Sequence, residues 1–193
     1  MDLEKRAFLI CSVRDCPPEE MARLNQYRYQ LERQGYKVHF PPEDTNQNDS
    51  IGLSICSKNR NAILNSDEIH IMYNPNSEGS KFDLGMTFMA GKPLIVANPL
   101  ITINDDFGLF IAKYSSNMTF SQYNSLFDHF TKRKQEISES DIIEYIWFEN
   151  SPEFLFDFGM AFMAEKQIKL INKKNVQQTP NKSFQNVLLE LTK

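Results

Sequence analysis

The sequence predicts an α/β fold with a mostly parallel, doubly wound sheet. Short apolar runs rich in β-forming residues alternate with helical segments along the chain, and this alternation favours parallel strands joined by right-handed crossovers. In addition, a strand–helix–strand segment occurs twice, at residues 66–98 and 140–172. We therefore expect residues 1–193 to form a single α/β domain that is built partly from a duplicated unit.

Composition narrows the functional classes. Hydrophobic residues make up 41% of the chain, which is enough for a sizeable core, and the 15 phenylalanines predict that this core is aromatic. The net charge of -4 and the lack of a basic stripe argue against a nucleic-acid polymer as partner. No apolar run is long enough for a membrane span, and the first six residues are too charged for a signal peptide.

Cysteine and histidine usage predicts a reduced protein without a metal site. The three cysteines, Cys11, Cys16 and Cys56, are odd in number and match no metal-ligand spacing. The three histidines are single and scattered. The chain also has no GxGxxG and no GxxxxGK[ST] motif. We expect a cytoplasmic protein that uses no metal and no other cofactor.

Four strands are expected in the first half of the chain, at residues 7–11, 36–40, 69–73 and 94–97. After the first strand, Pro17 and Pro18 open a helix because proline is tolerated in a first turn, and Gly35 ends that helix. The polar segment 43–50 is long for a connection, so it is a candidate functional loop. Two further helices are expected, at residues 55–65 and 80–90.

The second half repeats part of the first. Residues 66–98 and 140–172 align without a gap at an offset of 74 residues, and 14 of the 33 positions are identical. Both copies contain the motif Phe-Asp-x-Gly-Met-x-Phe-Met-Ala-x-Lys. Two copies are too few to stack into an array, so we interpret them as a duplicated unit and not as a solenoid. Other helices are expected at residues 105–113, 121–134 and 183–191, and a polar linker at residues 173–182.

Asp83 is the leading candidate for chemistry. We expect it in the first turn of a helix at the carboxyl end of the sheet, where open α/β folds bind ligands. A carboxylate at this place, kept ionised by the helix N-terminus, could trap or stabilise the oxocarbenium ion of a breaking N-glycosidic bond. Alternatively, Ser80 and Asp83 could form a capping box. In the second copy Ser80 is replaced by Phe154, yet Asp157 persists and is a second candidate.

Residues near the predicted strand ends supply candidate ligand contacts. Gly79 would let a ligand approach the backbone, and the N–H groups of Ser80 and its successors would form an anion cradle. Ser12 and Arg14 follow the first strand and suit a phosphate or carboxylate group. A solvated side chain is an equally good interpretation of Arg14.

Four segments together resemble the nucleoside 2-deoxyribosyltransferase-like superfamily, which includes deoxynucleoside 5′-monophosphate N-glycosidases. They are AFLICSVRD, LERQGYKVHFPP, NRNAILNSDEIHI and SEGSKFDLGMTFMAGKPLIV, and they lie within residues 7–98. The last segment is similar to the family signature Gly-Thr/Ser-x-x-Glu-Leu-Gly-x-Ala-x-x-x-Gly-Lys-Pro. The resemblance implies a flavodoxin-like fold in which residues 1–98 form the core and residues 99–193 form an extension with the second copy.

The resemblance also implies roles for single residues. The family's nucleophilic Glu falls on Asp83, which is one methylene shorter. A family Asp that helps handle the leaving base falls on Asn59, and a substrate-binding Tyr of the first strand falls on Phe8. The phosphate loop of the monophosphate glycosidases falls on Ser12 and Arg14. Family members are usually homo-oligomers whose sites borrow residues from a neighbour.

Three functional hypotheses follow. The first is an enzyme that cleaves the N-glycosidic bond of a nucleoside or nucleotide, or transfers its 2-deoxyribosyl group, with Asp83 and Asn59 as catalytic residues. The second is a non-catalytic binder or sensor of a nucleotide-derived ligand, which the three replacements within the family pattern favour. The third is a structural or oligomer-forming protein in which the second copy extends the sheet.

Overall fold

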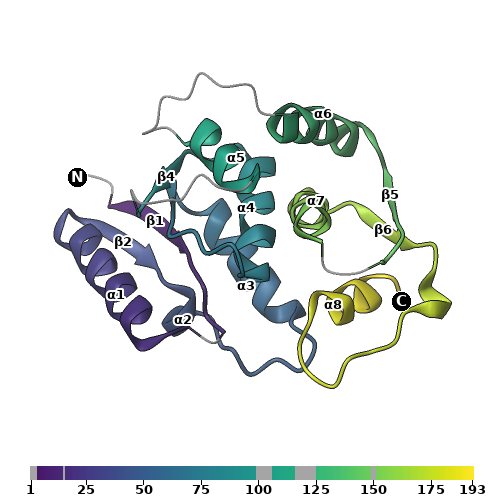
Figure 1. The fold of residues 1–193 in the computed structure, drawn as a ribbon, viewed down its shortest axis with the longest axis horizontal. Coiled ribbons are helices and arrows are strands. Elements are labelled where there is room, and N and C mark those ends of the chain that lie inside the picture. The colour runs from purple at the N-terminus through teal and green to yellow at the C-terminus, as the bar shows by residue number, and fades with distance from the viewer. Residues whose placement is uncertain (1–3, 15, 99–105, 116–124, 149–150) are drawn as a thin grey trace.

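The computed structural model describes residues 4–14, 16–98, 106–115, 125–148 and 151–193 (Figure 1). It confirms the expected α/β class, with a flavodoxin-like parallel sheet in the order β2-β1-β3-β4. The expected loop residue Asp15 and the first residues of the helices expected at 105–113 and 121–134 lie outside the described residues. The strands of this sheet are β1 (Lys5–Ile10), β2 (Tyr36–His39), β3 (Glu68–Ile71) and β4 (Leu94–Val96).

Helices cover both faces of this sheet. The helices of the first half are α1 (Pro18–Arg33), the short α2 (Pro41–Asp44), α3 (Leu53–Leu64) and α4 (Glu78–Ala90). In Figure 1, α1 lies on one side of the strands, and α3 and α4 lie on the other. Alternate residues of β1 follow this division, because Leu9 packs with Leu24 of α1 while Phe8 and Ile10 belong to the core beneath α3 and α4.

The second half forms its own small sheet. Its elements are α5 (Asp106–Tyr114), α6 (Ser125–Glu139), β5 (Ile142–Tyr145), α7 (Pro152–Met163), β6 (Gln167–Leu170), the 3₁₀ turn η1 (Lys173–Asn175) and α8 (Phe184–Leu191). β5 and β6 pair in parallel with each other and not with the first sheet, so the second copy does not extend that sheet as the third hypothesis assumed. None of the described helices is both long and apolar enough to cross a lipid bilayer.

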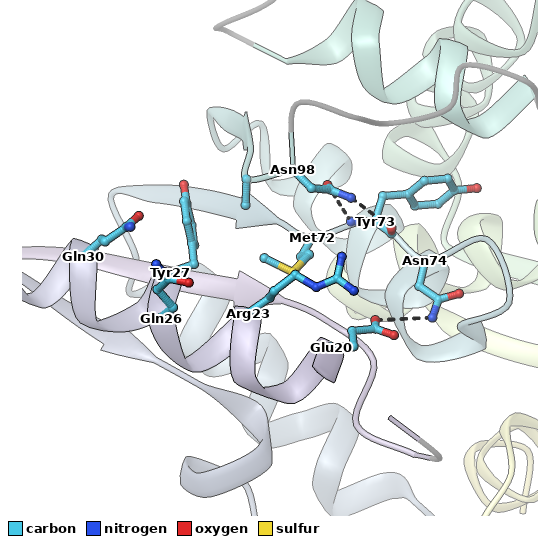
Figure 2. A pocket seen from close by; sticks show the side chains of 10 residues that line it. Glu20, Arg23, Gln26, Tyr27, Gln30, Met72, Tyr73, Asn74 and Asn98 are labelled. Atoms are coloured by element: carbon cyan, nitrogen blue, oxygen red, sulfur yellow. Dashed lines mark hydrogen bonds between the residues drawn. The ribbon is translucent and has the colours of Figure 1, made fainter. Parts of the chain in front are cut away.

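The repeated sequence forms a repeated structure. Ile69 of β3 pairs with Leu94 of β4, and the residues 74 positions later, Ile143 and Ile168, pair in the same register. The last asparagine of each copy ties the two strand ends together. Asn98 accepts a hydrogen bond from the Tyr73 N–H at 3.2 Å (Figure 2), and its counterpart accepts one from the Trp147 N–H at 2.9 Å. The two copies are therefore alike in structure as well as in sequence.

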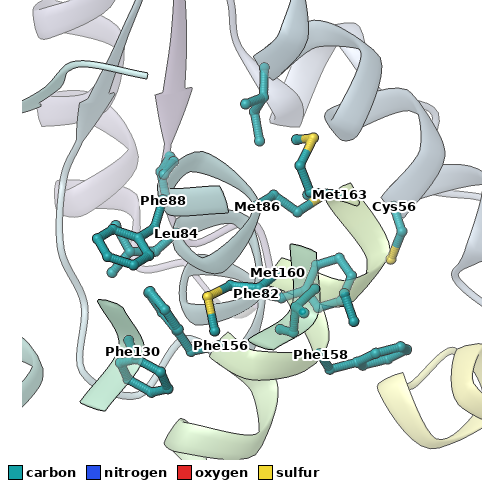
Figure 3. Close-up of a cluster of buried hydrophobic side chains, with 14 of the residues drawn as sticks. Cys56, Phe82, Leu84, Met86, Phe88, Phe130, Phe156, Phe158, Met160 and Met163 are labelled. Carbon is teal, nitrogen blue, oxygen red and sulfur yellow. The ribbon is translucent and has the colours of Figure 1, made fainter. Parts of the chain in front are cut away.

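The two copies meet where α4 and α7 cross. A Cβ atom on Gly85 would overlap the carbonyl group of Phe156, and one on Gly159 would overlap the carbonyl group of Phe82. Gly159 and Phe156 are the counterparts of Gly85 and Phe82, so the contact is reciprocal, as across a two-fold axis. Phenylalanine and methionine side chains from both helices form one apolar cluster around the crossing (Figure 3). The second unit is thus packed onto the helix that carries Asp83.

Candidate functional site

A cavity of about 750 Å³ opens at the carboxyl ends of β1 and β3. In the strand order β2-β1-β3-β4 this is the place where the chain switches from one side of β1 to the other, which is the usual ligand site of open α/β sheets. The walls come from the β1–α1 loop, α3, the start of α4 and the C-terminal segment. Five residues predicted from the sequence line it, namely Ser12, Arg14, Asn59, Gly79 and Asp83.

Asp83 lies deeper in its helix than the sequence predicted. α4 begins at Glu78, and Ser77 is its N-cap, with the Ser77 hydroxyl oxygen accepting a hydrogen bond from the Ser80 N–H at 3.2 Å. Asp83 therefore belongs to the second turn, so the expected position in the first turn is wrong. Because Ser77 provides the cap, the capping box proposed for Ser80 and Asp83 does not account for the Asp83 carboxylate.

Burial controls the charge of Asp83. The residue is 7% exposed. Burial raises the pKa of Asp83 from its ordinary 3.8 to about 7, and a hydrogen bond from Asn59 partly opposes that rise. The expectation that the helix N-terminus keeps this carboxyl ionised is therefore wrong. Asp83 lies one turn inside α4, where the helix dipole is weaker, and the loss of hydration outweighs it. At neutral pH the group exists in both protonation states.

Asn59 fixes the orientation of Asp83. Its Nδ2 donates to Oδ2 of Asp83 at 3.2 Å, and lies 3.5 Å from Oδ1. The Asn59 Oδ1 accepts a hydrogen bond from the Thr45 hydroxyl at 2.9 Å. Since Thr45 gives its single proton to Asn59, its oxygen accepts from Nε2 of His39, 3.0 Å away. A polar chain of four side chains thus ends on the candidate carboxyl group.

Ser12, Arg14 and Gly79 face the same cavity. Ser12 is buried, whereas Arg14 is exposed at the mouth and donates from Nη2 to the carbonyl oxygen of Lys182 at 3.0 Å. A Cβ atom on Gly79 would meet no protein atom within 4 Å, so packing does not require glycine there. The missing side chain leaves space on the cavity side.

Two other predicted site residues do not reach the cavity wall. Phe8 is fully buried, because it points into the core from β1, and its ring stacks on that of His39 at 5.3 Å. Ser80 is also buried, and its hydroxyl donates to Oγ of Ser77 at 2.9 Å. Ser77 itself lines the cavity. Ser80 therefore supports Ser77, which faces the cavity, whereas Phe8 packs against His39, which is not among the residues that line the cavity.

Several residues of the site were not predicted from the sequence. Lys182 and Phe184 belong to the C-terminal segment, which was expected to be a linker followed by a terminal helix, yet both line the cavity. Thr45, which holds Asn59, lies in the polar segment 43–50 that was singled out as a candidate functional loop. The Thr45 hydroxyl bonds to Asn59 of α3, 14 residues further along the chain, so the sequence around Thr45 does not identify this contact.

Asp157 occupies a different environment from Asp83. Its carboxylate oxygens accept hydrogen bonds from Nε of Arg133 at 2.7 Å and from Nη2 at 3.3 Å. The Tyr145 hydroxyl adds a third bond at 2.7 Å. Arg133 lies 74 residues after Asn59, so a cation stands beside Asp157 where a neutral amide stands beside Asp83. A carboxylate held by an arginine and a tyrosine is a structural ion pair, and this contrast favours Asp83 as the chemical group.

A second hollow of about 510 Å³ lies between α1 and the ends of β3 and β4 (Figure 2). Glu20, Arg23 and Tyr27 form its α1 side, and Asn74 and Asn98 are on the opposite side. Its carboxylate, Glu20, is partly exposed and accepts a bond from Asn74 at 3.4 Å. This hollow has no counterpart to the buried Asp83–Asn59 pair among its lining residues, so it is the weaker candidate.

Neither a metal-ligand cluster nor a known relative defines the site further. Within the described parts of the chain, no group of three or more His, Cys, Asp or Glu side chains is arranged to hold a metal ion. No family model, curated protein or solved structure matches the chain. The side chains around the cavity are therefore the basis for inferring a function.

Proposed function

We propose that the protein cleaves the N-glycosidic bond of a nucleoside or nucleotide, by hydrolysis or by transfer of a 2-deoxyribosyl group. One observation supports this proposal above all. The nearly buried carboxyl group of Asp83, held by the neutral amide of Asn59, forms part of the wall of a 750 Å³ cavity at the ligand end of the sheet. A cavity of this volume is typical of small-molecule sites.

In the proposed reaction the ionised Asp83 faces C1′ of the sugar. The C1′–N bond breaks, its electron pair leaves with the base, and an Asp83 oxygen either bonds to C1′ or stabilises its positive charge. Oδ1 is suited to this role, because the hydrogen bond from Asn59 is shorter to Oδ2. Water or a second base then attacks C1′ and frees Asp83. Asn59 cannot exchange a proton, so it orients the carboxylate, and the leaving base takes its proton from water.

Ser12 and Arg14 would bind a phosphate on the 5′ carbon. Ser12 offers a hydroxyl at the end of β1, and Arg14 offers guanidinium N–H groups at the cavity mouth. Charge-assisted hydrogen bonds from arginine are well suited to phosphate oxygens. The open space at Gly79 gives the ligand room beside the start of α4. The proposed ligand is therefore a small nucleoside or nucleotide.

Turnover of a panel of nucleosides and monophosphates, with free base measured by chromatography, tests the proposal. Asp83→Asn should reduce turnover about a hundredfold or more, because the variant lacks the charge that stabilises the transition state. Wild-type turnover should rise with pH through about 7, since the ionised form of Asp83 acts.

Asp157→Asn is the matched control, because it makes the same change in the other copy. We expect it to retain activity while it loses stability, since Arg133 then lacks its charged partner. Activity that survives Asp83→Asn but is lost in Asp157→Asn would transfer the site to the second copy.

A non-catalytic binder or sensor is the second candidate. The neutral Asn59 beside Asp83 favours it, because an amide cannot carry out acid–base chemistry. A nucleotide-induced rise in the thermal midpoint, lost in Arg14→Ala and without release of free base, would support the binder. Measurable turnover that depends on Asp83 would exclude it.

Two broader features belong to the same proposal. The homo-oligomeric state implied by the family resemblance is tested by light scattering of the purified chain, and a monomer mass would contradict it. A cytoplasmic location is supported by the three cysteines, Cys11, Cys16 and Cys56, which are all free thiols.

A further inference from the structure

One wall of the cavity comes from the C-terminal end of the chain. This wall is lined by Lys182, Ser183, Phe184 and Val187, whereas the other lining residues come from the first half of the chain. The ring of Phe184 packs against the ring of Phe82 in α4, with 4.7 Å between their centres. A segment that follows the second unit therefore closes the site of the first.

Contacts with the residues just before α3 hold this wall in place. The Ser183 N–H donates to the carbonyl oxygen of Ile51 at 3.3 Å. Gly52 lies so close that a Cβ atom there would be 3.3 Å from Cγ2 of Val187. Behind the wall, the buried side chain of Asn186 bonds to backbone groups of the loop before α8. Contacts within the chain therefore hold the wall in place.

Lys182 brings a second positive charge to the mouth of the cavity, beside Arg14. Its Nζ donates to the backbone and side-chain oxygens of Gln47, at 2.9 and 3.1 Å. An ammonium group has three N–H bonds, so one of them has no partner among the described residues. Burial and the nearby charge of Arg14 lower the pKa of Lys182, and Asp49 opposes this only in part.

Asp49 offsets the two positive charges only in part, because it forms no ion pair with Arg14 or Lys182 among the described residues. Its carboxylate accepts hydrogen bonds from the N–H groups of Ile51 and Ser54 and from the Ser54 hydroxyl, so it serves the start of α3. The repulsion between Lys182 and Arg14 is relieved when a doubly charged anion lies between them. A phosphate monoester, with a second pKa near 6, carries about that charge at neutral pH.

We propose that Lys182 is a ligand-binding residue that, together with Arg14 and Ser12, holds the phosphate of a nucleoside 5′-monophosphate. This inference rests on the proposed function, and it narrows the substrate class from nucleosides in general to their monophosphates. It also gives the second unit a role. β6 of that unit packs against α8, and α8 begins at the cavity wall. The second unit therefore helps to hold the C-terminal segment at the site.

Isothermal titration calorimetry on the full chain tests the inference. An Asp83→Asn background slows turnover, and the ligands are a nucleoside 5′-monophosphate and the matching nucleoside. The dissociation constant of the nucleoside divided by that of the monophosphate isolates the contribution of the phosphate to binding. Adding Lys182→Gln should reduce this ratio about tenfold, because one charge-assisted hydrogen bond is lost. Binding of the nucleoside should stay the same.

Two further substitutions serve as controls. Lys182→Arg keeps the charge and should retain most of the ratio, whereas Lys174→Gln removes an exposed lysine elsewhere and should not change it. A ratio that is unchanged in Lys182→Gln would overturn this inference and leave the proposed function intact. If the Asp83→Asn variant binds neither ligand and the wild type cleaves neither, the proposed function and this inference both fail. Should Lys182→Gln not fold, Lys182→Met provides the same comparison.

Discussion

Asp83 and Asp157 occupy equivalent positions in two copies of one unit, yet their surroundings differ. Asp157 is paired with Arg133, and Tyr145 completes its hydrogen bonding. Asp83 has an amide donor in place of that arginine, and no cation of the described residues forms an ion pair with it. A buried carboxyl group without a cation is costly to keep ionised, and such groups are concentrated at functional sites.

This imbalance predicts a pH-dependent stability effect of Asp83→Asn. The folded-state pKa of about 7 lies above the ordinary value of 3.8, so the folded protein binds the extra proton between these limits. The stability that protonated Asp83 contributes is present below pH 3.8 and is lost as the pH rises through 7. Asp83→Asn should therefore match the wild type near pH 4 and exceed it at pH 8, by on the order of 4 kcal/mol.

Urea unfolding at both pH values measures this difference in the free energy of unfolding. Asp157→Asn should show no such gain at pH 8, because its carboxylate is stabilised by Arg133. An Asp83→Asn variant that is less stable than the wild type at pH 8 would mean that the Asp83 carboxylate is favourably paired in the folded protein.

At the level of elements, the crossing of α4 and α7 joins the two copies. Gly85 and Gly159 let the two backbones approach until each glycine touches a carbonyl group of the other helix. The aromatic rings around them fill the remaining space, and Phe82 packs against both Phe158 and Phe162 of α7. The position of α4, and with it that of Asp83, thus depends on the second unit.

Gly85→Ala should therefore destabilise the protein by about 2–4 kcal/mol, because the added methyl group pushes the two helices apart. Gly79→Ala is the matched control in the same helix, since a Cβ atom there meets no protein atom within 4 Å. Denaturant unfolding of the two variants gives the comparison. Equal stability of the two variants would show that the helices do not cross as closely as described.

At the level of the whole molecule, the features predicted correctly from the sequence are those that local residue patterns determine. The strands of the first sheet follow from short buried runs, and the duplication follows from direct alignment. The rule that ligands bind at the carboxyl ends of parallel strands put Ser12 and Asp83 at one edge of the sheet, and both line the cavity.

Other features depend on contacts between segments that are far apart in the chain. Lys182 joins the site because the C-terminal segment folds back against Gln47 and the residues before α3, and no local sequence pattern predicts that contact. The separate β5–β6 sheet was missed because a parallel strand pair has the same sequence pattern in either sheet. The charge of Asp83 was mispredicted because its burial depends on the entire cavity wall.

A crystal structure of the full-length Asp83→Asn variant with a nucleoside 5′-monophosphate tests the central claim most directly. The account predicts that C1′ of the sugar lies about 3–3.5 Å from the residue 83 side chain, with the phosphate between Arg14 and Lys182. A nucleotide bound with its sugar away from residue 83, or bound in the hollow beside α1, would contradict it.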